Sequence, residues 1–107
     1  MGNAKNQPLT ESVFYILLSL QTPLHGYGIM QNVKSLTNGR VNLGAGTLYG
    51  AINTLLSKGF ITESGADPAK KDYIITEEGR AVLTNELDRL RELVANGEKV
   101  LEGNNEG

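Results

Sequence analysis

The stretch that decides the fold is residues 46–61, GTLYGAINTLLSKGFI. Its larger aliphatic residues, Leu48, Ile52 and the pair 55–56, recur at helical spacing, which predicts a helix with one buried face. Gly59 is suited to end that helix, and Phe60 and Ile61 are typical of a strand that begins directly after it. The stretch therefore predicts a short helix that passes straight into a strand.

The opposite face of this predicted helix carries no charge, although a solvated helix normally shows Lys and Glu there. Its residues are Thr47, Tyr49, Gly50, Asn53 and Thr54. Short polar groups suit the DNA major groove, where Asn pairs well with adenine and Thr can also touch a thymine methyl. Tyr49 can donate to a phosphate, and Gly50 lets a sugar-phosphate strand come close. Alternatively, Tyr49 packs against the preceding helix, and Asn53 and Thr54 are simply solvated.

Length and composition predict a small domain without disulfides. The 107 residues are 39% hydrophobic, which supplies one modest core, and oligomerisation is a common remedy for a small core. The absence of cysteine excludes thiolate metal sites and fits a reducing, cytoplasmic compartment. No apolar run is long enough to span a bilayer, so no membrane partner is expected.

The net charge of −2 is unevenly distributed along the chain. Residues 1–75 hold six basic and four acidic residues, a balance of +2, and residues 76–107 hold four basic and eight acidic residues, a balance of −4. A mildly basic head can bind a polyanion despite an acidic tail. Charge alone nevertheless favours an ordinary acidic cytosolic protein.

The order of the predicted elements indicates the fold class. Helices are predicted over about 10–20, 25–36 and 46–58, a short extended piece over 40–43, strands over 60–64 and 72–75 with a turn between them, and a long helix from 76. We therefore predict a mainly α fold with a small β-hairpin. It consists of a winged helix-turn-helix domain over residues 9–75 and a long C-terminal helix over residues 76–102.

The last helix carries a heptad stripe with one vacant position at Gly97. Either the stripe folds back on its own domain, or it pairs with a second copy together with the strongly apolar first helix. We expect pairing through Leu83, Leu87, Leu90, Val94, Leu101, Val13 and Leu17. A twofold dimer reads a pseudo-palindromic site, with half-sites roughly 34–36 Å apart if they lie one turn apart. Phe14 and Tyr15 are interpreted first as core residues and second as the lining of a ligand pocket at this interface.

Three further polar residues are candidates for DNA contact. Lys70 and Lys71 at the hairpin tip can neutralise phosphate charge, although lysines there can equally be a soluble turn. His25, the single histidine, caps or packs at the start of the second helix, where a phosphate contact is also conceivable. One histidine makes no zinc site or catalytic triad, and no phosphate-binding loop follows Gly46. We therefore expect no enzyme activity, no cofactor and no metal.

The chain resembles the PadR family of winged-helix transcriptional regulators. The resemblance is carried by residues 9–20, by Leu-His-Gly-Tyr-Gly-Ile at 24–29, by Gly-Thr-Leu-Tyr at 46–49 continuing to Gly-Phe-Ile at 59–61, and by 73–80. It implies a homodimeric repressor of the short subgroup, with one C-terminal dimerisation helix and an effector such as a phenolic acid or a drug near the dimer interface. The chain departs from the family pattern at Gly28, where an acid is common, in its weakly basic wing, and in lacking a tryptophan in the final helix.

The sequence thus predicts a sequence-specific DNA-binding transcriptional regulator. It is expected to be a homodimeric repressor that binds double-stranded operator DNA and is relieved by a small molecule or another signal. The alternative is a winged-helix module that binds a protein and not DNA. The acidic C-terminal part and the modest wing charge favour that alternative.

Overall fold

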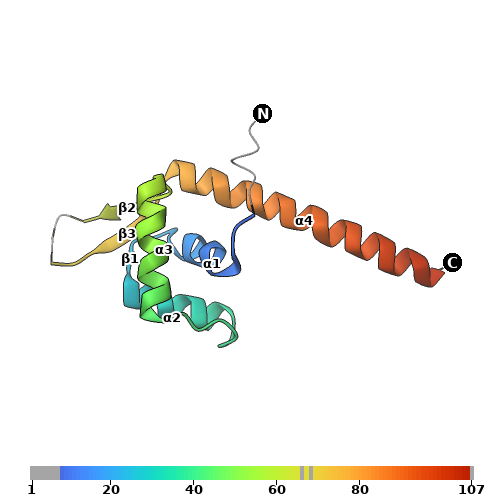
Figure 1. Ribbon diagram of the computed structural model, residues 1–107, viewed down its shortest axis with the longest axis horizontal. Coiled ribbons are helices and arrows are strands. Elements are labelled where there is room, and N and C mark those ends of the chain that lie inside the picture. Colours follow the sequence, from blue (N-terminus) through green and yellow to red (C-terminus); the bar gives the residue numbers. More distant parts are fainter. Residues whose placement is uncertain (1–7, 66, 68, 107) are drawn as a thin grey trace.

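Four helices and three short strands make up the chain in this computed structural model, which describes residues 8–106 apart from 66 and 68, with side chains as far as residue 103. The elements in order are α1 (Glu11–Ser19), β1 (Leu24–His25), α2 (Gly26–Leu36), α3 (Ala45–Lys58), β2 (Ile61–Ser64), β3 (Asp72–Ile75) and α4 (Glu77–Glu106). Figure 1 shows α1, α2, α3 and the sheet gathered into a head. The long α4 projects from this head on the side opposite the hairpin.

The sheet is antiparallel and has the strand order β1-β3-β2. The predicted hairpin is confirmed, with Ile61 opposite Ile75 and Ser64 opposite Asp72. The third strand, β1, was not predicted, and it pairs His25 with Asp72. The extended piece predicted over 40–43 forms no strand and belongs to the loop before α3. A two-residue strand carries no periodic signal of its own, because its pairing depends on the position of β3 in the folded chain.

Capping residues fix the ends of the helices close to the predicted positions. The Thr10 hydroxyl accepts a hydrogen bond from the backbone N–H of Val13 and so caps α1. Gly59 ends α3 in the left-handed conformation, with φ of 79°. His25 is the residue before α2, but its side chain makes no capping hydrogen bond, so the predicted capping role of this side chain is wrong.

The core lies where α1, α2 and α3 meet the sheet. The inner face of α3 is buried as its spacing predicted, and it contributes Leu48, Ile52 and Leu55. The other buried hydrophobic residues are Ile16, Leu17, Leu20, Ile29, Val33, Leu43, Ile61, Tyr73, Ile75 and Leu83. Because this one face of α3 is buried in the head, its polar face is directed outward.

The start of α4 is held tightly against the hairpin. The Thr76 hydroxyl donates to the carbonyl oxygen of Gly59 at 2.6 Å and accepts from the N–H of Gly79 at 3.0 Å. A Cβ atom on Gly79 would lie 2.0 Å from the carbonyl oxygen of Phe60, so this close approach requires glycine. Within the described residues, no helix combines the length and the apolar character needed to cross a membrane.

Candidate nucleic-acid interface

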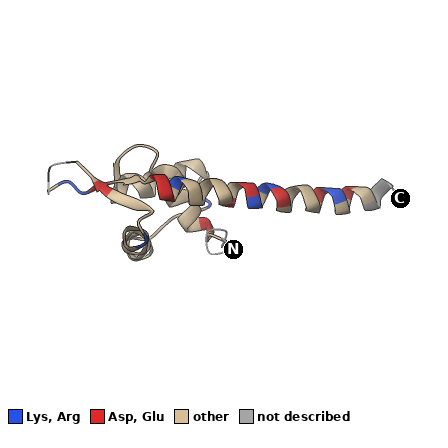
Figure 2. Cartoon of the chain, turned by 90° about the horizontal axis from the view of Figure 1, so that it is seen from above, with Lys and Arg blue, Asp and Glu red and all other residues tan. Residues whose placement is uncertain are grey.

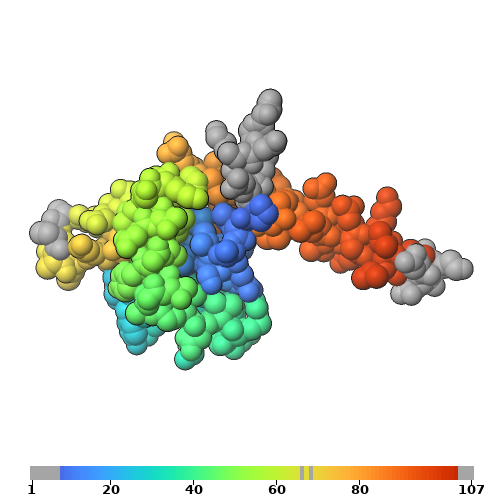
Figure 3. Space-filling model, viewed as in Figure 1, coloured from blue at the N-terminus to red at the C-terminus, as the bar shows by residue number. Residues whose placement is uncertain are grey.

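The outward face of α3 is open and uncharged up to its last turn. Thr47, Tyr49, Gly50, Asn53 and Thr54 are all exposed, as the sequence predicted. Figure 3 shows α3, in green, uncovered on the face turned toward the viewer. A Cβ atom on Gly50 would meet nothing within 4 Å apart from its chain neighbours and its own helix backbone, so another surface can approach the helix there. The Thr54 hydroxyl donates to the carbonyl of Gly50 at 3.2 Å and therefore stays close to its own helix.

Tyr49 differs from its neighbours on this face because its ring packs on α2. Its hydroxyl lies so close to Gly26 that a Cβ on that glycine would come within 2.2 Å of it. Tyr49 remains 46% exposed. The pKa of the Tyr73 phenol is raised above its usual value, mainly by burial and next by the negative charge of Glu63. Tyr49 makes a smaller contribution to the same shift. The packing alternative therefore holds for Tyr49, and its hydroxyl is positioned by α2.

The short strand β1 brings His25 to the base of the wing. His25 and Asp72 are opposite each other in the sheet, and together with Ala69, Lys70 and Lys71 they line one hollow. The structure thus brings together three of the candidate contact residues. His25 is 45 residues or more from the two lysines in the sequence. Asp72 lies among them and reduces the positive charge of this group.

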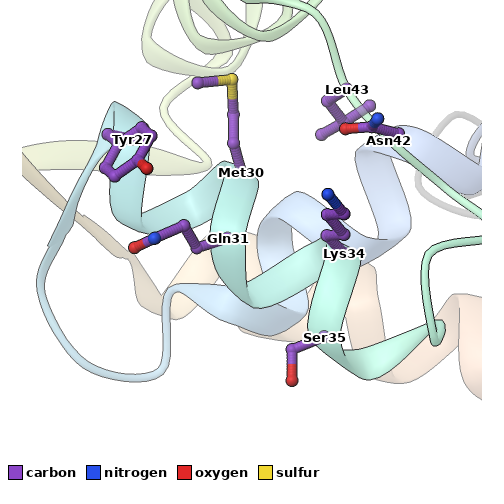
Figure 4. A pocket seen from close by; sticks show the side chains of 7 residues that line it. All are labelled: Tyr27, Met30, Gln31, Lys34, Ser35, Asn42 and Leu43. Atoms are coloured by element: carbon purple, nitrogen blue, oxygen red, sulfur yellow. The ribbon is translucent and has the colours of Figure 1, made fainter.

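The outer side of α2 holds polar residues that the sequence reasoning missed. Tyr27 is 59% exposed, and Gln31, Lys34 and Asn42 are exposed as well. Figure 4 shows them around a hollow that α2 forms with the segment leading into α3. The signal was available, because positions 27, 31 and 34 follow the spacing of one helix face, opposite the buried Ile29 and Val33.

Some basic residues of the head are already engaged within the chain. Arg40 forms an ion pair with the exposed Glu11. The hydrogen bond from Arg40 keeps the pKa of the Glu11 carboxyl below its usual value. Arg80 donates to the amide oxygen of Gln21 at 2.6 Å. Among the described residues of the head, the basic side chains outside these contacts are Lys34, Lys58, Lys70 and Lys71. Lys34 lies on α2, Lys58 in the last turn of α3, and Lys70 and Lys71 in the wing, which fits a division between neutral groups for bases and lysines for phosphates.

The residues proposed for dimerisation divide into two groups. Leu17 and Leu83 are buried in the chain's own core, so they present no surface to a second copy. Val13 and Leu90 are half-buried, and Leu87, Val94 and Leu101 are exposed. Every described side chain from residue 91 to 103 is exposed, since this part of α4 extends beyond the head.

The joint between α1 and α4 contains a buried charge. Glu86 is 4% exposed, and its carboxylate accepts hydrogen bonds from the Arg89 guanidinium at 2.7 and 2.8 Å and from the Leu9 N–H at 3.1 Å. The bonds from Arg89 are the main reason that the pKa of Glu86 is below its usual value, with Leu9 adding to the effect against the opposing influence of burial. Phe14 and Tyr15 pack edge to face beside it, with ring centres 5.8 Å apart.

Nothing in the described part of the chain resembles a metal centre, since it contains no group of three or more His, Cys, Asp or Glu side chains placed to hold an ion.

The helix-turn-helix, the wing and the open α3 face define a winged-helix protein of the DNA-binding type. Residues 15–85 match the model of the transcriptional regulator PadR-like family. The chain therefore belongs to the PadR-like family of transcriptional regulators, proteins that control genes and generally are not enzymes. No curated protein matches the sequence at a significant level.

Solved structures of similar fold include other regulators. A PadR family transcriptional regulator from Eggerthella lenta is 29% identical, with 84% of this chain and 80% of that chain covered and a TM-score of 0.68. A PadR family regulator from hypervirulent Clostridium difficile is 21% identical, with 86% and 99% covered and a TM-score of 0.72. A transcriptional regulator from Clostridium thermocellum is 23% identical, with 87% and 90% covered and a TM-score of 0.68.

Proposed function

We propose that this chain is a homodimeric repressor that binds a specific operator with the exposed face of α3. The observation that carries the proposal is that this face is neutral, polar and exposed along the helix as far as Lys58 in its last turn. Thr47 and Asn53 contact base edges in the major groove, and Lys70 and Lys71 contact phosphates. His25 lies beside these lysines and contributes to the same backbone contact.

The projecting part of α4 supports the homodimer. Helices in proteins owe most of their stability to the packing of an apolar face, and the side chains of α4 beyond Leu90 are all exposed as far as residue 103. Its exposed apolar side chains are Leu93, Val94, Val100 and Leu101. Figure 2 shows both acidic and basic positions along the same segment, so the chain here carries charges of both signs beside the stripe. A second copy that buries this stripe stabilises both helices.

The effector site proposed from the sequence has a candidate location at the joint of α1 and α4. A cavity of about 280 Å³ is lined there by Leu9, Glu11, Phe14, Tyr15, Glu86, Arg89 and Leu90. It includes the two aromatic residues considered for such a pocket. A small molecule bound between α1 and α4 changes the angle between the head and the dimerisation helix. Repression is relieved because that angle sets the spacing of the two α3 helices.

A gel shift with DNA from the region upstream of the chain's own gene tests this proposal. We expect a retarded band at low salt that weakens steeply as salt is added, because bound lysines release counterions from the DNA. Lys70→Ala combined with Lys71→Ala is expected to weaken binding to every duplex to a similar extent. A folded dimer that gives no shift even at low salt would instead favour the protein-binding alternative.

A further inference from the structure

The outer side of α2 forms a hollow next to the start of α3. Seven residues line this α2 hollow, which has a volume of about 420 Å³: Tyr27, Met30, Gln31, Lys34, Ser35, Asn42 and Leu43. Figure 4 shows the Lys34 side chain extending from α2 toward Asn42 and Leu43, whereas Ser35 points away from that space. Only Gly44 separates Leu43 from Ala45, the first residue of α3, so the hollow lies close to the start of the proposed recognition helix.

The chemistry of the α2 hollow suits an anion. Apart from Ser35, which points away, its polar side chains are a phenol, two amides and an ammonium group, all of which can donate hydrogen bonds. No acidic residue is among those that line it in the described part of the chain. The hollow at the wing base differs in this respect, because Asp72 lies beside Lys70 and Lys71. Lys34 therefore attracts a nearby anion without a competing carboxylate in the same hollow.

We propose that the α2 hollow binds a phosphate of the DNA backbone, with Lys34 as the charged contact and the neighbouring Asn42 as a hydrogen-bond donor. This inference rests on the proposed DNA-binding function. The α3 face supplies no charge before Lys58, so elements beside it must supply the attraction for the strand that lies along its first turn. Such a contact adds affinity for every sequence and holds α3 in register, but it does not distinguish base pairs.

Salt titrations test the proposed role of Lys34. A mixed-sequence duplex is the probe, because the contact is independent of sequence. We expect Lys34→Gln to reduce the slope of log affinity against log salt by about 1.8, since each dimer loses two phosphate contacts. When salt is raised from about 50 to about 200 mM, the factor by which DNA affinity falls is then about 12 times smaller for the variant than for the wild type.

Matched variants separate this contact from general charge effects. Lys99→Gln removes the same charge from the projecting part of α4, and Ser35→Ala changes a residue of α2 that points away from the hollow. Both are expected to keep the wild-type slope, and so is Lys34→Arg. If the wild type binds the duplex and Lys34→Gln shows the same slope of log affinity against log salt, the inference is overturned and the proposed function stays intact. A wild type that binds no duplex overturns both.

Backbone amide shifts distinguish a duplex phosphate from a free phosphate. We expect the signals of Lys34 and Asn42 to move when the mixed-sequence duplex is added and to stay in place with inorganic phosphate at the same ionic strength. Movement with inorganic phosphate but not with the duplex contradicts the proposal, because the hollow would then serve a free phosphate compound.

Discussion

Serine substitutions at Val94 and Leu101 are expected to separate the proposed homodimer. These side chains are 58% and 68% exposed in the single chain, and both lie on the apolar stripe of α4. Full burial of an aliphatic side chain is worth about 2 kcal/mol, so burying the exposed parts contributes about 2.5 kcal/mol per subunit. Losing about 5 kcal/mol per dimer raises the dissociation constant by about three to four orders of magnitude.

Sedimentation equilibrium over a wide range of protein concentration measures this change. The matched control is Glu92→Ser with Lys99→Ser, which lie seven residues apart on the other side of the same projecting segment. The control carries at least as large a helix-propensity cost as the test variant, because Glu and Lys both favour helix over Ser whereas Val does not, and it is expected to remain a dimer. The reasoning is refuted if test variant and control dissociate at the same concentration, or if the wild type is a monomer throughout.

Other features of the chain give predictions that can be checked on the same purified protein. Gly79→Ala is expected to lower the free energy of unfolding by about 1–3 kcal/mol, because the added Cβ meets the carbonyl oxygen of Phe60. Gly50→Ala, where the added Cβ meets open space, is expected to raise the free energy of unfolding by about 0.5–1 kcal/mol. Urea denaturation of the two variants and the wild type measures both changes. The Arg89-paired carboxylate of Glu86 has a lowered pKa, so its contribution to stability is complete above the ordinary value of 4.5 and is lost as pH falls below it. The difference in unfolding free energy between wild type and Glu86→Gln is therefore expected to shrink below that pH, and a difference that stays constant into acid would contradict this assignment.

Most of the fold could be predicted because its signals are local. The spacing of Leu48, Ile52 and Leu55 determines which side of α3 is buried, and Gly59 marks where the helix ends. Thr10 likewise marks the start of α1. The strand β1 could not be predicted in this way, because two residues form a strand only when β3 is placed beside them.

The candidate site was predictable only in part. The periodicity of α3 was enough to place Thr47 and Asn53 on the open face. The packing of Tyr49 on α2 could be given only as an alternative to a phosphate contact, because it depends on the crossing of α2 and α3 and on the missing Cβ of Gly26. The α2 hollow was missed for a similar reason, since Asn42 comes from a loop whose path follows from the packing of both helices.

The relative affinity of wild type and Asn53→Ala for two duplexes tests the central claim most directly. The duplexes are the site protected in a footprint of the upstream DNA and a mixed-sequence duplex of equal length, both at one salt concentration. If α3 reads bases, Asn53→Ala loses about 1–3 kcal/mol of discrimination per contacted base pair, a drop of between about 5-fold and 150-fold in the ratio of the two affinities. An unchanged ratio, with the wild type discriminating between the duplexes, would contradict the base-reading role of this face.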